Sequence, residues 1–313
     1  MTDQPILTVE DLAKTFKVGF TRKVVDAVRG ISLSVAPGEI FGFLGPNGAG
    51  KTTSIKMCMD LIRPTGGSIR MFGLPPGTRK ARAKVGYLPE QPYFYDYLKP
   101  GEIIDFFGRL YGLKRKDRRR RTEELIDLVG LTHARNRTLR KFSKGMLQRL
   151  GLAQALVSDP ELVILDEPLS GLDPIGRKEL KDIIASLKKK GTTVFFSSHI
   201  LADIELLCDR IAIIDKGKLK YLGPTRDFVQ RGRKEVEVVV SGISDEAVAA
   251  LEKDLLSVER FGATLKMLCS VGNSAGVVRN LVEAGGMVES VVPRSESLED
   301  IFVRIAGPSG GTP

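Results

Sequence analysis

The sequence predicts an α/β protein built around a buried parallel sheet and followed by a small α+β domain. Three observations support this prediction: a glycine-rich loop between an expected strand and helix, an apolar strand that ends on two acidic residues, and alternating strand and helix patterns after residue 224. A chain of 313 residues is longer than one average domain, so two domains are expected. We place them at residues 1–224 and 225–313, with a helical subdomain at about 92–158.

The composition is that of an ordinary globular protein, with 42% hydrophobic and 27% charged residues. No apolar run reaches the roughly 18 residues of a membrane-spanning helix, and the N-terminus lacks the basic and apolar pattern of a signal peptide. The three cysteines lack metal-ligand spacing, as expected for buried thiols in a reducing compartment. These features predict a cytoplasmic protein.

The net charge of +10 comes largely from the basic run Lys114–Arg121, with a smaller cluster at Lys188–Lys190. Nucleic acid or an anionic membrane surface would explain such clusters. A solvated helix end explains them as well and is the plainer interpretation. Charge alone does not decide between these alternatives.

The N-terminal region predicts an antiparallel β-layer. Residues 6–14 and 24–35 alternate loosely between apolar and polar residues and lead into the turn Pro37-Gly38. Phe16 lies in this layer and could either stack on a nucleobase or simply pack against its neighbours.

A phosphate-binding loop is predicted at residues 45–52, whose sequence GPNGAGKT fits the pattern G-x-x-x-x-G-K-[ST]. The expected strand 39–44 precedes it and the expected helix 53–61 follows it. Glycines allow backbone N–H groups to converge on phosphate oxygens, and the start of the helix adds partial positive charge. In this arrangement Lys51 reaches the β- and γ-phosphates and the Thr52 hydroxyl ligates Mg²⁺.

The middle of the chain predicts strands at 68–73 and 84–88 and helices at 101–113, 118–130 and 143–157. Ser143 is the expected N-cap of the last of these helices. Eight of the 20 Phe and Tyr residues fall within positions 87–111. This concentration fits a docking surface, but it fits a local core beneath a helical subdomain equally well.

A second chemical signal lies at the end of the apolar run Leu162–Leu165, which predicts a strand buried on both faces. Asp166 and Glu167 follow it at the carboxyl edge of the sheet, where ligands bind in such folds. We expect Asp166 to hold Mg²⁺ through its water shell and Glu167 to polarise the attacking water. A helix is expected over about 176–190. The next buried strand ends at His199, which is placed to contact the γ-phosphate, whereas His133 is interpreted as structural.

This ordered set of motifs resembles the nucleotide-binding subunit of an ABC transporter over residues 5–224. Residues 45–52 match the Walker A loop and residues 162–167 match the Walker B strand with its catalytic Glu. Ser170–Asp173 matches the loop across the dimer seam, and His199 matches the switch histidine. Gln91 matches the glutamine that senses Mg²⁺ and couples to the membrane partner.

The signature turn departs from the usual family pattern. Ser143-Lys144-Gly145-Met146 stands where the family usually has Ser-Gly-Gly-Gln. Ser143 and Gly145 are kept, and similar Ser-Lys-Gly-Met turns are familiar among single-cassette export ATPases. The substitutions therefore do not indicate a loss of activity.

The resemblance implies a P-loop NTPase cassette with a mixed RecA-like sheet core, an antiparallel β-layer and a helical subdomain. It further implies ATP and Mg²⁺ as ligands, head-to-tail pairing with a second cassette (a homodimer or, alternatively, a heterodimer), and a separate polytopic membrane permease that holds the protein at the inner face of the cell membrane. The expected catalytic residues are Glu167, His199 and Gln91, and the expected metal ligands are Thr52, Gln91 and Asp166. The residues expected to contact the nucleotide are Phe16, Gly45, Pro46, Asn47, Gly48, Ala49, Gly50, Lys51, Thr52, Thr53, Ser143, Gly145 and Asp173.

The C-terminal region predicts a small α+β accessory domain with no catalytic motif. Strands are expected at 235–240, 263–271 and 286–292, and helices at 245–256, 274–285 and 297–305. The segment 297–302 resembles the tail of drug-, polysaccharide- and lipid-exporter ATPases. The final residues 307–313 are rich in Gly and Pro and are expected to be disordered.

Two other classes of protein were weighed against a transport ATPase. A soluble ABC ATPase acting on ribosomes or nucleic acid would usually carry two cassettes or a long coiled-coil insertion, and this chain has neither pattern. A P-loop GTPase is excluded because the N-K-x-D motif is absent. The sequence therefore favours the ATPase subunit of an exporter, with nucleic acid an unlikely partner.

Overall fold

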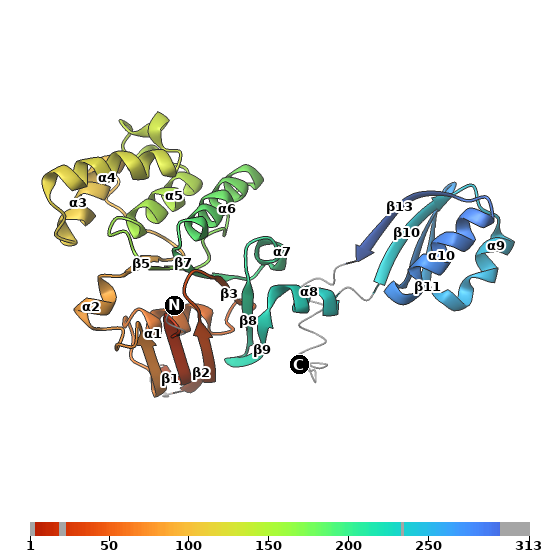
Figure 1. The fold of residues 1–313 in the computed structure, drawn as a ribbon, viewed down its shortest axis with the longest axis horizontal. Helices are drawn as coiled ribbons and strands as arrows, with labels where there is room; N and C mark the ends of the chain where they lie inside the picture. The colour runs from red at the N-terminus through yellow and green to blue at the C-terminus, as the bar shows by residue number, and fades with distance from the viewer. Residues whose placement is uncertain (1–3, 19–22, 233–234, 295–313) are drawn as a thin grey trace. The chain divides into compact units, whose positions relative to one another are not determined.

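The computed structural model describes residues 4–18, 23–232 and 235–294. The chain separates into two compact units, Met1–Thr225 and Arg226–Pro313. Figure 1 shows the elements of each unit along the chain.

The first unit is built on a six-stranded mixed sheet. Its strands, in spatial order, are β5 (Val85–Leu88), β6 (Leu162–Leu165), β7 (Thr193–Ser198), β3 (Ile40–Leu44), β8 (Arg210–Asp215) and β9 (Lys218–Pro224). The first five strands run parallel, and β9 pairs antiparallel to β8. Every residue of β3, β6 and β7 is buried, as expected for parallel strands covered on both faces.

The expected antiparallel β-layer forms a separate three-stranded sheet. Its order is β2 (Lys23–Val35), β1 (Leu7–Val18) and β4 (Gly66–Met71). Buried residues of this layer, such as Leu7 and Ile31, share one core with Phe41 and Phe43 of β3 and with Ile55. Burial of this apolar surface holds the layer beside the phosphate-binding loop.

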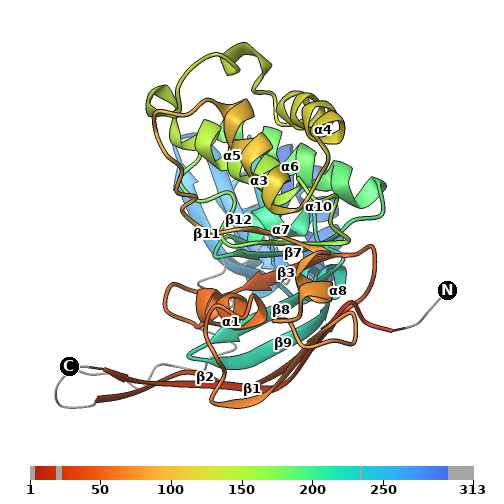
Figure 2. The same ribbon diagram turned by 90° about the vertical axis from the view of Figure 1, so that its left-hand side faces the viewer.

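Helices cover the central sheet on both sides (Figure 2). The helices of this unit are α1 (Lys51–Cys58), α2 (Arg79–Arg82), α3 (Pro100–Leu110), α4 (Arg115–Leu128), α5 (Lys144–Ala155), α6 (Pro174–Lys189) and α7 (Leu201–Glu205). In Figure 2, α3 to α6 lie on one side of the sheet and α1 lies on the other. Helix α1 begins at Lys51, two residues before the predicted start at residue 53. Its N-cap is Gly50, which has a positive φ of 108° that glycine adopts readily.

The second unit begins with α8 (Thr225–Gly232) and continues into a four-stranded antiparallel sheet with two helices. Its elements in chain order are β10 (Glu235–Ser241), α9 (Asp245–Ala250), β11 (Leu255–Phe261), β12 (Thr264–Ser270), α10 (Val271–Glu283) and β13 (Met287–Arg294). The spatial order β11-β12-β10-β13 is the β-α-β-β-α-β arrangement of ferredoxin-like domains.

One element of this unit differs from its prediction. The expected helix 245–256 ends at Ala250, and residues 255–261 form the edge strand β11. None of the residues of β11 is buried, so the sequence lacks the buried alternation that identifies a strand. The predicted helix 297–305 and the tail 307–313 lie outside the described residues.

Within the described ranges, no helix combines the length and the apolar character that crossing a membrane requires.

Candidate functional site

The glycine-rich loop joins β3 to α1 and is packed closely against neighbouring backbone. A Cβ atom on Gly45 would lie 2.5 Å from the carbonyl oxygen of Ile214, and one on Gly50 would lie 2.5 Å from that of Ala27. Gly48 also adopts a positive φ, of 80°. These positions require glycine, and the loop therefore presents backbone rather than side chains where α1 begins.

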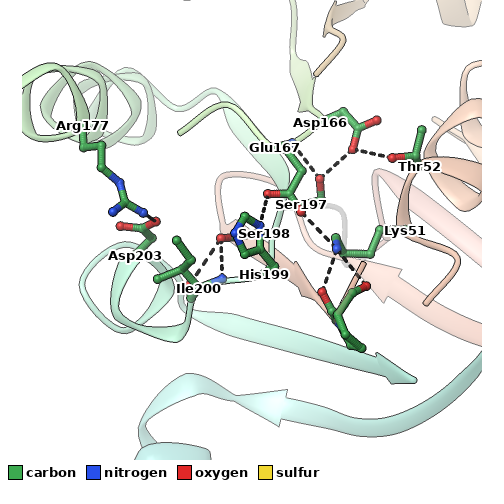
Figure 3. Close-up of polar contacts among 12 residues, drawn as sticks. Lys51, Thr52, Asp166, Glu167, Arg177, Ser197, Ser198, His199, Ile200 and Asp203 are labelled. Atoms are coloured by element: carbon green, nitrogen blue, oxygen red, sulfur yellow. Dashed lines mark hydrogen bonds and ion pairs between the residues drawn. The ribbon is translucent and has the colours of Figure 1, made fainter. Parts of the chain in front are cut away.

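Lys51 is buried and makes three polar contacts through one ammonium group. Its Nζ lies 2.6 Å from the Gly45 carbonyl oxygen and 3.2 Å from that of Pro46. The same Nζ forms an ion pair of 3.0 Å with Oε1 of Glu167. The first basic residue of α1 is thereby tied to the end of β6 (Figure 3).

Asp166 lies at the end of β6 and collects two hydroxyl donors. Its Oδ1 accepts hydrogen bonds from Ser197 at 2.8 Å and from Thr52 at 3.3 Å. Burial raises the pKa of Asp166, the two hydroxyl donors oppose that rise, and the charges of Glu90 and Glu167 add to it. Asp166 and Thr52 thus place two oxygen donors side by side, the ligand type that Mg²⁺ prefers.

Glu167 is held in an unusual backbone conformation. Its φ is +47°, which is uncommon for a residue other than glycine. Its N–H donates to the Ser197 hydroxyl at 2.8 Å, and its Oε2 lies 2.8 Å from Nδ1 of His199. The carboxylate is therefore positioned from both sides, by Lys51 and by His199 (Figure 3).

Ser197 on β7 supports both acidic residues, and the sequence analysis missed it. Its hydroxyl donates to Asp166 and accepts from Glu167, and its side chain is fully buried. The signal was present as two polar residues, Ser197 and Ser198, that end an otherwise apolar strand.

We expect Ser197→Ala to lower the free energy of unfolding by about 1–3 kcal/mol, because it leaves the buried N–H of Glu167 without a partner. Chemical denaturation measures this loss. The matched control is Ser186→Ala, since the Ser186 hydroxyl donates to the carbonyl oxygen of Ile183 within its own helix, α6. Equal losses in both variants would contradict a special role for Ser197.

These residues surround a cavity of about 370 Å³. It is lined by Ala27, Asn47, Gly48, Gly50, Lys51, Thr52, Thr53, Glu90, Glu167, Ser170 and His199. The loop backbone, the helix N-terminus and Lys51 suit a phosphate chain, and the oxygens of Thr52 and Asp166 suit Mg²⁺. The site fits both ligands.

Gln91 and Phe16 are among the predicted site residues that do not line this cavity. Gln91 is exposed, and its neighbour Glu90 lines the cavity instead. Glu90 was not among the predicted site residues, although it follows Pro89 directly at the end of a predicted strand. Phe16 is half-buried, and the Lys14 ammonium lies 5.1 Å from the centre of its ring.

The signature turn lies outside the cavity and contacts the loop before α6. Ser143 caps α5 by accepting a hydrogen bond of 3.3 Å from the N–H of Met146. A Cβ on Gly171 would lie 2.2 Å from the Lys144 Nζ, so this lysine lies directly over that glycine. Asp173 caps α6 by accepting from the N–H of Gly176 at 3.1 Å. The turn that holds Ser143 and Gly145 therefore lies against Gly171 and Leu172, and neither it nor Asp173 lines the cavity.

The segment after His199 is fixed to α6 by a buried acid. Asp203 of α7 forms ion pairs with Arg177 at 2.6 Å and with Lys181 at 3.0 Å. Its side chain is 4% exposed, so both pairs are shielded from water. This link restrains the helix that follows His199 (Figure 3).

Comparison with known proteins agrees with this geometry. The family model described as ABC transporter matches residues 28–170. An uncharacterised ABC transporter ATP-binding protein of Synechocystis is 43% identical over 304 residues, covering 94% of this chain and 82% of that protein. The bacitracin transport ATP-binding protein BcrA of Bacillus licheniformis is 38% identical over 98% of both chains. The linearmycin resistance ATP-binding protein LnrL of Bacillus subtilis is 34% identical, covering 94% of this chain and 97% of that protein.

A solved structure shows the same fold. The ATP-binding subunit of an ABC transporter matches with a TM-score of 0.63 at 32% identity, covering 72% of this chain and 92% of that chain. This chain therefore belongs to the family of ABC transporter ATP-binding proteins. It is a subunit that binds and hydrolyses ATP, and its family pairs with membrane permeases.

Proposed function

We propose that this chain hydrolyses ATP to drive export through a permease encoded as a separate chain. The observation that carries the proposal is the carboxylate of Glu167, held between Lys51 and His199 beside the cavity. Export is supported by two relatives whose names concern antibiotics, one in bacitracin transport and one in linearmycin resistance. Resistance achieved by transport requires outward movement of the antibiotic.

Each of the residues around the cavity has its own proposed role in ATP hydrolysis. Glu167 accepts a proton from the water that attacks the terminal phosphorus, and the bond to the bridging oxygen breaks to release ADP and phosphate. His199 orients Glu167 and the γ-phosphate, and Lys51 offsets negative charge on the phosphate oxygens. Thr52 and Asp166 would hold Mg²⁺, which supplies charge neutralisation on the β- and γ-phosphates when bound. Glu90, rather than the predicted Gln91, lines the cavity, and its charge acts on Asp166.

A second cassette is proposed to complete the site. Ser143 and Gly145 do not line the cavity of their own chain. Ser143 is the N-cap of α5 and Gly145 lies in its first turn, and a helix N-terminus favours anions. Head-to-tail pairing would bring this turn to the nucleotide of the other cassette. Two copies of this chain are the simplest pair.

The permease is proposed to dock at an aromatic groove. The groove has a volume of about 640 Å³. Its lining consists of Tyr93, Phe94, Tyr95, Tyr97, Leu98, Gly101, Glu102, Ile103, Asp105, Phe106, Phe107 and Arg109. The Tyr93 side chain is 91% exposed and that of Tyr97 is 67% exposed, which suits anchors for a partner better than a closed core.

The test is co-purification from detergent-solubilised membranes of the native host, with a tagged Glu167→Gln variant and ATP. A polytopic membrane protein that co-elutes supports the transport assignment. Adding Tyr93→Ala and Tyr97→Ala should then reduce its recovery at least tenfold while ATP binding is retained, because hot-spot aromatics carry much of a docking energy. The matched control removes two exposed apolar side chains of the second unit, Leu256→Ala with Phe261→Ala. Ribosomes or nucleic acid without a membrane protein would contradict the proposed function.

A further inference from the structure

Two of the seven basic residues in the run 114–121 are used inside the protein. Arg118 pairs with Asp105 at 2.7 Å and donates to the Leu113 carbonyl oxygen at 2.8 Å. Arg121 donates to the Leu156 carbonyl oxygen at 2.8 Å and pairs with Asp159 at 3.1 Å. These two arginines fasten α4 to α3 and to the end of α5, which gives them a structural role.

Four others form what we term the cationic corner, at the start of α4. It comprises Lys114, Arg115, Lys116 and Arg119, all exposed. Within the described part of the chain, no ion pair or hydrogen bond engages these four side chains. Four neighbouring cations without anionic partners repel one another, and binding of an anionic partner would relieve this repulsion.

Exposed apolar side chains lie on α3, shortly before the cationic corner in the chain. Leu110, at the end of α3, is 67% exposed, and Phe106 is 49% exposed one helical turn earlier. Because residues four apart share a helix face, Phe106, which lines the aromatic groove, and Leu110 form one exposed apolar stripe on α3. Leu110 is the significant residue, since an exposed aliphatic side chain offers nothing to a phosphodiester backbone but inserts readily among lipid headgroups.

We propose that the cationic corner, with Leu110 and Phe106, binds the anionic phospholipid headgroups of the membrane that holds the permease. The nearness of the corner to the membrane rests on the proposed function, because a permease docked in the groove would bring the membrane close. The binding chemistry itself rests only on the charges and apolar side chains described above. A protein held at the membrane by both contacts stays near its permease between docking events.

The test uses the purified full-length chain and vesicles sedimented at near-physiological salt. Vesicles of phosphatidylglycerol mixed with phosphatidylcholine should bind the protein, and vesicles of phosphatidylcholine alone should not. Because each basic residue near an anionic surface contributes about fivefold in affinity, the triple variant Lys114→Glu, Arg115→Glu and Lys116→Glu should weaken binding at least tenfold. These substitutions place acids at the start of α4, where the helix dipole favours them, so the helix is preserved. ATP binding should be unchanged.

The matched control removes the same charge from α6 and its C-cap, with Lys178→Glu, Lys189→Glu and Lys190→Glu, and should bind vesicles as the wild type does. Leu110→Ser should weaken binding several-fold, which no purely electrostatic contact predicts. Equal losses in the two triple variants, or no vesicle binding by the wild type, would overturn the inference. So would displacement from vesicles by duplex RNA at lower concentration than by soluble anionic lipid, which would assign the corner to nucleic acid. Vesicle binding without ATP hydrolysis would refute the proposed function and leave the lipid contact standing.

Discussion

Glu167→Gln is expected to lower steady-state ATP hydrolysis by a factor of about 10²–10⁴ and to leave ATP binding intact. The amide keeps the shape of the side chain but does not accept a proton from the attacking water at neutral pH. Loss of the negative charge also removes the ion pair with Lys51, which frees the ammonium for phosphate oxygens. ATP should therefore bind at least as tightly as in the wild type, and the paired, ATP-bound form should accumulate.

Single-turnover hydrolysis and nucleotide binding, measured on the same preparation, separate these two effects. The matched control is Glu161→Gln, the same chemical change just before β6, where the carboxylate pairs with exposed Lys84. This control should hydrolyse ATP at the wild-type rate. Full turnover by Glu167→Gln would reject Glu167 as the base.

Lys51→Ala is expected to weaken ATP binding by about ten- to a hundredfold, the range for losing a hydrogen bond to a charged group. The cavity wall carries the carboxylates of Glu90 and Glu167, with that of Asp166 close by, and Lys51 is the only lysine or arginine among the described lining residues. Removing it leaves these acids to repel the phosphate chain.

Equilibrium titration with ATP and Mg²⁺ measures the change in affinity. Lys84→Ala removes an exposed lysine from an ion pair with Glu161 and serves as the control, with unchanged affinity expected. Thermal unfolding should show that the Lys51→Ala protein is folded. Wild-type affinity in that folded variant would show that Lys51 does not contact the phosphates.

The strongest sequence predictions were those carried by short contiguous segments. The loop 45–52 needs particular residues at fixed spacing because backbone geometry and phosphate contacts act within a few positions. The strand that ends at Asp166 and Glu167 is recognisable because it is buried on both faces and apolar throughout. For such segments, local pattern and tertiary position give the same information.

Features that depend on contacts between distant segments were harder to predict. Ser197 meets Asp166 across two neighbouring strands, and no local pattern marks that contact. Glu90 and Gln91 are adjacent and both polar, and only the path of the chain after Pro89 brings Glu90 to the cavity. Strand β11 is held by pairing with β12 and lacks the buried alternation that would mark it.

The ion pair between Lys51 and Glu167 has a consequence for the order of ATP binding and hydrolysis. The Lys51 ammonium lies 3.0 Å from Oε1 of Glu167, the same carboxylate that is proposed to act on the attacking water. An arriving γ-phosphate is expected to compete with Glu167 for that ammonium. Binding of ATP would then free the carboxylate for its proposed role as the base. We expect the 3.0 Å contact between Lys51 and Glu167 to delay hydrolysis in this way until ATP is bound.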